Sequence, residues 1–269
     1  MLPLHDGVTT RTVSVWDDRL NVRVQVKGDG DPLVYLHPAG GLTWDSFLDD
    51  LATDHTVLAP EFPGTTPGDS GAIHLLDDVF DVVLAYDELV RALGAEGAPL
   101  IGQSFGGMLA AELASVVPDL CSKVVLLDPV GLWREDHPVS LDFIAGPPDR
   151  IPGLLFHDLE CAGAQAMFTP PDDPRVAAEA TAALVWAIGC TSKFLWPVPD
   201  RGLDKRLHRL SAPTLVMWGE QDALVSPVYA EEFGRRIADC RVVTVPNCGH
   251  IPQVEQPEIT IATVREFLG

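Results

Sequence analysis

Residues 100–114 read LIGQSFGGMLAAELA and contain the spacing that decides the fold, Gly102-Gln103-Ser104-Phe105-Gly106. This G-x-S-x-G pattern follows an apolar run and precedes a helix-forming one. On a strained strand-to-helix turn of this kind, side chains two residues before or after the serine would clash, which explains the two glycines. Such a turn holds the Ser104 hydroxyl out at the carboxyl end of a sheet, where a base can reach it. Because the chain has 23 glycines, the pattern alone is only moderately specific, and the remaining sequence must support it.

The composition is that of a globular protein, with 46% hydrophobic and 21% charged residues. A length of 269 residues suits one large α/β domain with room for an inserted subdomain. Acidic residues outnumber basic ones 39 to 18, which gives a net charge of −21. A surface of this charge repels phosphate backbones and anionic lipid, so we expect neither nucleic acid nor a membrane surface as a partner.

The cysteines favour a reducing compartment, since they are five in number, scattered, and without a C-x-x-C pair. The first residues, MLPLHDGVTTR, lack a basic region followed by an apolar stretch. No uninterrupted apolar run approaches the length of a membrane span. The sequence therefore predicts a cytoplasmic protein.

Apolar patterning predicts a sheet with helices on both of its faces. Two stretches near the N-terminus, 12–16 and 21–27, alternate apolar with polar residues and predict a half-solvated hairpin. Six later runs are short and continuously apolar, as in parallel strands buried on both faces. These runs cover 33–37, 56–60, 98–102, 123–128, 214–219 and 241–245. Helical periodicity over 77–93, a nearly all-apolar helix over 108–117 and a helix start at Ser226-Pro227 lie between them.

The alternation of strands and helices stops between residues 133 and 209. This segment carries two Pro-Pro pairs, a helical stretch over 174–188 and a group of aromatic residues. It predicts an inserted helical cap over residues 133–209, while residues 1–132 and 210–269 form the core. The predicted lining of a substrate pocket under this cap comprises Trp133, Phe143, Trp186, Phe194, Trp196 and Ile251.

A serine is a poor nucleophile near neutral pH unless a base, itself oriented by an acid, removes its proton. His250 follows the apolar run 241–245, and Asp222 follows the run 214–219. Both therefore fall at the carboxyl ends of predicted strands, on the same side as Ser104. Asp128 also follows a strand and is the alternative acid, although we favour Asp222.

The chain resembles the cap-bearing members of the α/β-hydrolase family over nearly its whole length. The matching segments are HPAGG (37–41), GQSFGG (102–107), WGEQDALVSP (218–227) and GHIPQVEQP (249–257), in the family's order. The resemblance implies an eight-stranded, mostly parallel sheet with helices on both faces and an inserted helical cap. It also implies a catalytic triad of Ser104, Asp222 and His250.

The same resemblance implies an oxyanion hole formed by the backbone N–H groups of Phe105 and Ala39. In the family this loop usually begins His-Gly, whereas here it begins His37-Pro38. Proline has no N–H, but the usual donor is the following residue, so Ala39 keeps that role. We expect His37 to fix the loop and not to act as a second base.

A serine at the turn excludes the dehalogenase and epoxide-hydrolase relatives, which use aspartate there. The prediction is a serine hydrolase that cleaves a small apolar carboxylic ester. The alternative is a carbon–carbon hydrolase of ring-cleavage diketones, whose members commonly carry Trp after the base histidine, where this chain has Ile251. Perhydrolysis is compatible with either interpretation, and a non-catalytic receptor is the weaker one. We expect no cofactor and no metal, since the other histidines lack ligand spacing, and a monomer or a homodimer.

Overall fold

The computed structural model describes residues 4–140 and 142–269, and its strands form one sheet. Within these residues the sheet has eight strands in the order β1-β2-β4-β3-β5-β6-β7-β8. Strands β3 to β8 are mutually parallel, whereas β2 runs antiparallel to both β1 and β4. The strands are β1 (Thr9–Val15), β2 (Leu20–Lys27), β3 (Asp31–Leu36), β4 (His55–Pro60), β5 (Leu100–Gln103), β6 (Val124–Leu127), β7 (Thr214–Gly219) and β8 (Cys240–Val245). The predicted eight-stranded, mostly parallel sheet is confirmed.

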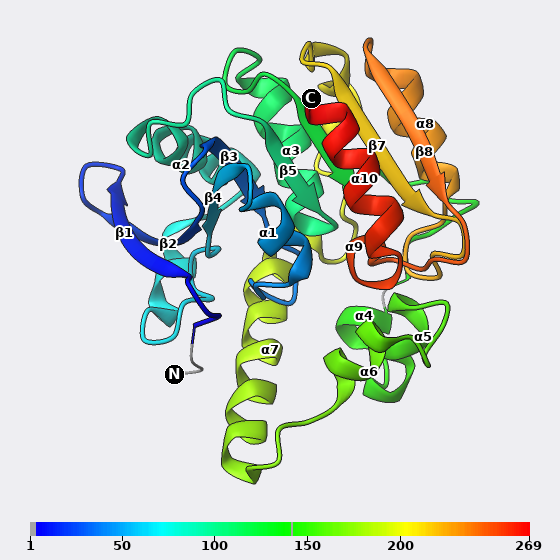
Figure 1. Ribbon diagram of the computed structural model, residues 1–269. Helices are drawn as coiled ribbons and strands as arrows, with labels where there is room; N and C mark the ends of the chain where they lie inside the picture. The colour runs from blue at the N-terminus through cyan, green and yellow to red at the C-terminus, as the bar shows by residue number, and fades with distance from the viewer. Residues whose placement is uncertain (1–3, 141) are drawn as a thin grey trace.

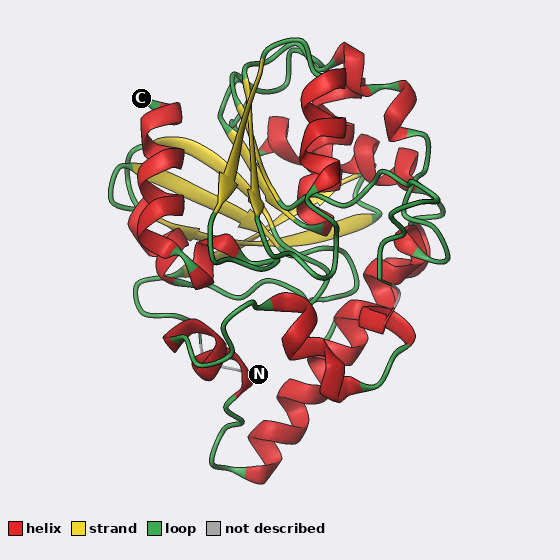
Figure 2. Cartoon of the chain, turned by 90° about the vertical axis from the view of Figure 1, so that its right-hand side faces the viewer, coloured by secondary structure: helices red, strands yellow, loops and turns green. Residues whose placement is uncertain are grey.

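Helices cover both faces of the sheet (Figures 1 and 2). Helices α1 (Ser46–Leu51), α9 (Pro252–Glu255) and α10 (Pro257–Leu268) lie on one face. The other face carries α2 (Val79–Ala92), α3 (Phe105–Val116) and α8 (Val228–Arg236). Successive β7 residues alternate between the two cores: Met217 joins one hydrophobic cluster and Trp218 the other. Since both faces are covered, the central strands carry the continuously apolar sequence of a buried parallel sheet.

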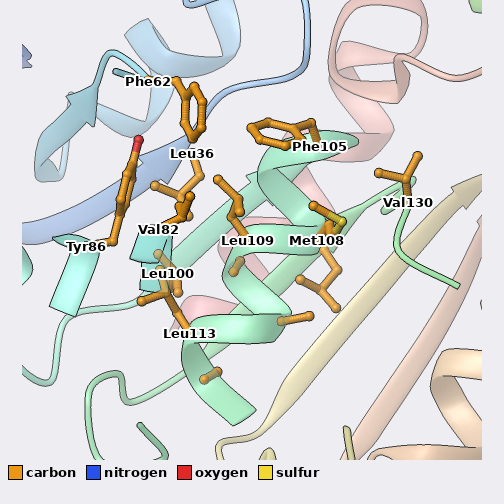
Figure 3. Close-up of a cluster of buried hydrophobic side chains, with 14 of the residues drawn as sticks. Leu36, Phe62, Val82, Tyr86, Leu100, Phe105, Met108, Leu109, Leu113 and Val130 are labelled. Atoms are coloured by element: carbon orange, nitrogen blue, oxygen red, sulfur yellow. The ribbon is translucent and has the colours of Figure 1, made fainter. Parts of the chain in front are cut away.

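The first turn of helix α3 packs closely against the sheet, above the core shown in Figure 3. Its flank carries Met108, Leu109 and Leu113, which pack with apolar side chains of α2 and β5. A Cβ atom on Gly106 would lie 2.0 Å from the Leu36 carbonyl oxygen, and one on Gly102 would lie 2.2 Å from the Gly106 carbonyl oxygen. Neither backbone atom could yield without moving a strand or the helix, so both glycines are required for the crossing.

Between β6 and β7 the chain leaves the sheet and forms the helices below it in Figure 1. These are α4 (Asp142–Ala145), α5 (Ile151–Leu155), α6 (Ala162–Phe168) and the long α7 (Pro174–Leu195). Short 3-10 segments occur at Ser70–Leu75, Pro148–Arg150, Leu203–Lys205 and Leu207–Arg209. In the described part of the chain, no helix has both the length and the apolar composition needed to span a bilayer.

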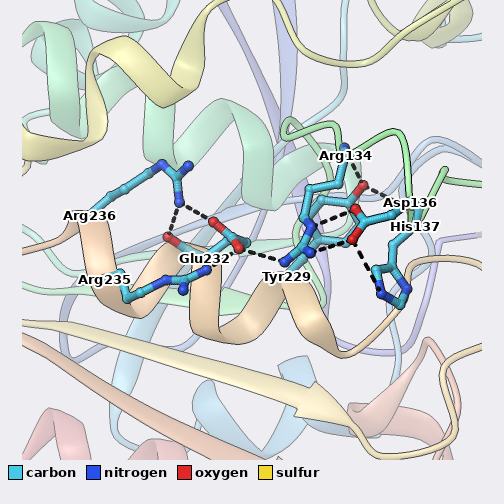
Figure 4. Close-up of polar contacts among 7 residues, drawn as sticks. All are labelled: Arg134, Asp136, His137, Tyr229, Glu232, Arg235 and Arg236. Carbon is cyan, nitrogen blue, oxygen red and sulfur yellow. Dashed lines mark hydrogen bonds and ion pairs between the residues drawn. The ribbon is translucent and has the colours of Figure 1, made fainter.

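A polar network fixes the chain to α8 where it leaves the sheet, just before α4 (Figure 4). Glu232 of α8 accepts from Arg134, Arg235 and Arg236. The guanidinium groups, Arg236 foremost, hold the pKa of the Glu232 carboxyl below its usual value. Tyr229 accepts from the Arg134 N–H at 2.8 Å and donates to the His137 carbonyl at 2.6 Å.

We expect Gly106→Ala to lower the free energy of unfolding by about 3 kcal/mol or more, because the new methyl group meets fixed backbone. Gly189 provides the matched control, since it lies inside α7 and a Cβ there would contact nothing within 4 Å. Gly189→Ala should raise the free energy of unfolding by up to about 1 kcal/mol through helix propensity. Urea titration measures both values, and equal stability of Gly106→Ala and the parent protein would contradict the role given to this contact.

Candidate active site

Ser104 lies at the turn from β5 into α3, with φ 53° and ψ −113°. This backbone conformation is unfavourable for a residue with a side chain and persists only where the surroundings impose it. Its N–H donates to the Leu127 carbonyl at 2.8 Å, and its carbonyl accepts from the Met108 and Val130 N–H groups at 3.0 and 3.3 Å. The turn is therefore held from both neighbouring elements, and the serine side chain is directed beyond the end of the sheet.

His250 lies between Ser104 and Asp222. Its Nε2 is 2.8 Å from the Ser104 Oγ, and its Nδ1 is 2.7 Å from the Asp222 Oδ2. A carboxylate only accepts hydrogen bonds, so Nδ1 carries the proton and Nε2 is free to accept from the serine hydroxyl. The other oxygen of Asp222 accepts from the Leu224 and Val225 N–H groups at 2.8 and 2.9 Å. The structure thus brings together the three residues predicted as a triad, in the geometry that lets an imidazole deprotonate a serine.

The loop that carries His250 is fixed by a buried carboxylate that the sequence did not single out. Glu255 accepts from the N–H groups of Gly249, Asp158 and His157 at 2.7, 2.7 and 3.3 Å. The His250 N–H donates to the Leu155 carbonyl at 2.8 Å. The turn before α9 is thereby bonded to the end of α5. The available signal was a single acidic residue in the otherwise uncharged run after the histidine, IPQVEQP.

The predicted oxyanion donors lie beside Ser104. Ala39 lines the same cavity as Ser104, and Phe105 is the first residue of α3, where N–H groups have no carbonyl one turn earlier. His37 is buried at the start of this loop, with its Nδ1 2.7 Å from the Pro38 carbonyl and its Nε2 accepting from the Phe62 N–H at 2.9 Å. Burial lowers the pKa of His37, against the opposing effects of the Pro38 carbonyl and Glu61. A neutral imidazole with these two bonds supports the loop.

The cavity beside Ser104 has a volume of about 40 Å³, and its lining differs from the predicted one. It is lined by Ala39, Ser104, Val130, Val139, Ser140, Phe143, Ile144, Leu195, Pro199 and Leu224. Of the six predicted pocket residues, Phe143 lines it and the other five do not. The lining that the sequence did not indicate consists mainly of small and aliphatic side chains.

Each of those five residues has another position. Phe194 is buried in edge-to-face contact with Phe62 and also packs near Phe105. Trp186 donates to the Gly64 carbonyl and Trp133 donates to Glu135. Trp196 is 45% exposed and Ile251 is buried in the core. Aromatic residues in this segment therefore mostly fasten it to the sheet domain or face solvent.

Asp128, the alternative acid, follows β6 and is fully buried next to the site. Its Oδ1 accepts from the Gly219 N–H at 2.9 Å, whereas the imidazole is bonded to Asp222. Among the described residues, Asp128, Asp222 and His250 also form the one cluster whose donor atoms are close enough, within 4.8 Å, to surround a metal ion. The direct bond between His250 and Asp222 engages two of those donors with each other, so the cluster as it stands does not present three free ligands.

Comparison with known proteins supports a family assignment. A family model described as "Alpha/beta hydrolase family" matches residues 33–263. "Lipase 3" of Moraxella sp. (strain TA144) is 26% identical over 88% of this chain and 77% of that protein. A 2-hydroxy-6-oxo-6-phenylhexa-2,4-dienoate hydrolase of Burkholderia cepacia is 23% identical over 100% of this chain and 99% of that protein.

The fold is also that of solved structures. A membrane phospholipase A, described as a bacterial virulence factor, superimposes with a TM-score of 0.79 at 23% identity, covering 97% of this chain and 86% of that one. A variant of a meta-cleavage product hydrolase superimposes with a TM-score of 0.75 at 20% identity, covering 96% of this chain and 97% of that one. At these identities the likeness concerns the fold alone.

The buried, neutral His37 should make unfolding depend on pH. Because burial lowers its pKa below that of the unfolded chain, the unfolded state binds more protons below the ordinary value of 6.5, and the free energy of unfolding falls as pH drops. This group contributes up to about 1.4 kcal/mol per pH unit. We expect His37→Gln to remove that share, as measured by urea unfolding between about pH 7.5 and 5.5. The exposed His74 is the control, and an unchanged slope in His37→Gln would refute the prediction.

Proposed function

The chain belongs to the alpha/beta hydrolase family, and we propose that this hydrolase cleaves carboxylic esters of small apolar substrates through an acyl-enzyme on Ser104. The observation that carries the proposal is the pair of bonds at His250, 2.8 Å to the Ser104 Oγ and 2.7 Å to the Asp222 Oδ2. These bonds supply a nucleophile, a base and an orienting acid in contact, which acyl transfer to a serine requires.

In the proposed reaction His250 removes the Ser104 proton as Oγ attacks the ester carbonyl carbon. The carbonyl oxygen becomes an oxyanion and accepts from the N–H groups of Phe105 and Ala39. Collapse of this intermediate breaks the bond to the alcohol oxygen, which takes the proton from His250. A water molecule, deprotonated in turn by His250, attacks the acyl group and releases the carboxylic acid and Ser104. Asp222 stabilises the imidazolium in both halves of the reaction.

We propose residues 133–209 as a cap over this site. Phe143, Ile144, Leu195 and Pro199 of this segment line the cavity beside Ser104. The cavity is small, at about 40 Å³, and apart from Ser104 and Ser140 its lining side chains are apolar. An acyl chain of more than a few carbons would therefore require the cap side chains to move. Short, apolar acyl groups fit the proposal best.

Carbon–carbon hydrolysis of ring-cleavage diketones is the second candidate. It is favoured by relatives named for such hydrolysis that align with the whole of this chain, among them the Burkholderia cepacia protein. Ile251, where the resemblance leads one to expect Trp, weighs against it. Ester cleavage needs no residue beyond those already described and remains the main proposal.

The net charge and the cysteines support our proposals for the partners and the cellular location of the protein. A net charge of −21 supports a small-molecule substrate and disfavours nucleic-acid partners. The five cysteines, Cys121, Cys161, Cys190, Cys240 and Cys248, are all unpaired, which supports a reducing, cytoplasmic location. A monomer or a homodimer is compatible with this proposal.

Replacing Ser104 by Ala should lower kcat for p-nitrophenyl esters by about 10⁴-fold or more, because the nucleophile and its base act as a unit. A fluorophosphonate probe should label the parent protein and leave Ser104→Ala unlabelled. Labelling that survives the substitution would contradict the assignment. Rapid hydrolysis of a vinylogous diketone with poor turnover of every ester would favour the second candidate. Binding of a small ligand without any turnover would favour a receptor.

The cavity predicts a short acyl preference that depends on Phe143. Each methylene that fits should raise kcat/KM about three- to fourfold, from about 0.8 kcal/mol of burial, until the space is full. Phe143→Ala should move the optimum in a series of p-nitrophenyl esters toward longer chains. Trp196→Ala is the control, because that exposed side chain does not line the cavity. An equal shift in both variants, or in neither, would refute the assignment of Phe143.

A further inference from the structure

Three buried carboxyl groups lie around the loop of His250, and they differ in the number of donors that they receive. Asp222 accepts three hydrogen bonds, two from backbone N–H groups and one from the imidazole. Glu255 also accepts three, all from backbone N–H groups. Asp128 accepts one, from Gly219. Hydrogen bonds to a carboxylate stabilise its charge, so Asp222 and Glu255 are equipped to be anions and Asp128 is not.

The position of Asp128 makes a third anion costly. It is 0% exposed, and among the described residues its Oδ2 has no donor. One oxygen of its carboxyl group lies within 4.8 Å of a carboxylate oxygen of Asp222 and of a ring nitrogen of His250. Strands β6 and β7 are neighbours in parallel register, so the acids that follow them are held at the same edge of the sheet. When two carboxyl groups lie this close, the one that accepts fewer hydrogen bonds keeps its proton.

The titratable groups that face Asp128 also favour its protonated form. They are Asp222 on the loop after β7, Glu255 on α9, and Cys248 and His250 on the loop after β8. Burial, and then the charge of Asp222, raise the pKa of Asp128 well above its usual value, while the Gly219 N–H opposes them. Burial and the neighbouring acids raise the pKa of the Cys248 thiol as well.

We propose that Asp128 is a neutral carboxylic acid whose O–H donates to the Asp222 carboxylate and positions it against His250. In this arrangement the Asp128 Oδ1 accepts from Gly219, and its other oxygen carries the proton. Asp222 then receives a donor from the neighbouring strand end, in place of repulsion from a second anion. Asp128 is a positioning residue, and its effect on catalysis rests on the proposed function of Asp222.

Two substitutions separate this role from that of a charged or a merely structural residue. Asp128→Asn keeps one acceptor for Gly219 and supplies an N–H donor for Asp222 without any charge. Asp128→Gly removes both, and it suits the φ of 44° at this position, so the backbone is not strained. We expect Asp128→Gly to lower kcat/KM about ten- to a hundredfold. It should also move the acidic limb of the pH profile to higher pH, because an unsupported Asp222 attracts the imidazolium proton more strongly.

Asp128→Asn should recover most of the activity and return the acidic limb to its place in the parent protein. If Asp128→Asn lowered kcat/KM as much as Asp222→Asn does, the proposal would be overturned, since Asp128 would then be an ionised acid. A shift of the limb to lower pH by about one unit or more would overturn it too, because it would mean that a negative charge near His250 had been removed.

An infrared difference spectrum between the parent protein and Asp128→Asn tests the protonation state directly. At about pH 8 the parent should show the C=O stretching band of a protonated carboxylic acid, which Asp128→Asn lacks. Asp45, whose pKa burial raises to about 6, is ionised at that pH and is common to both proteins. Absence of the band from the difference spectrum refutes the proposal. The measurement needs no substrate and no folded Asp128→Gly, so it stays decisive if the proposed esterase activity fails.

Discussion

The contact between Gly106 and the Leu36 carbonyl is the constraint on which the rest of the site depends. It brings the first turn of α3 against the end of β3, at a distance that leaves no room for a Cβ. The chain on one side of this contact leads back to Ser104, and the chain on the other leads on through His37 to Ala39. One close approach of two backbones therefore sets the relative positions of the nucleophile and of both proposed oxyanion donors. The positive φ of Ser104 is the local strain that accompanies it.

Much of the sheet, and the candidate site residues at the carboxyl ends of its strands, could be predicted from the sequence, because the signals there are local. Buried parallel strands read as continuous apolar runs, and the residues that follow them must meet at one edge. Ser104, Asp222 and His250 each follow such a run within a few residues, so their meeting at one edge could be expected without knowledge of side-chain packing. The sequence favoured Asp222 over Asp128 although both follow a strand, and in the structure the hydrogen bond to the imidazole distinguishes them.

The pocket could not be predicted in the same way. Aromatic residues between β6 and β7 indicated a lining, but a large ring is equally suited to fastening one layer onto another. Phe194 does so against Phe62, and Trp186 through a bond to the Gly64 carbonyl. The small cavity is instead bounded largely by aliphatic residues such as Val139 and Leu224, which carry no sequence signal of their own. Which side of a helix faces the serine depends on contacts between segments far apart in the chain.

The bonds from Glu255 to His157 and Asp158, with the bond from His250 to Leu155, bear on how this architecture diversifies. An insertion after β6 is commonly regarded as a module that changes independently of the sheet that carries it. Here residues 155–158 and 249–255 share one backbone–backbone hydrogen bond and two bonds from backbone N–H groups to the Glu255 carboxylate, so the backbone path of each segment depends on the other. The two discontinuous pieces of chain are thus coupled through backbone geometry and the Glu255 carboxylate, so a change in the backbone path of one displaces hydrogen bonds of the other.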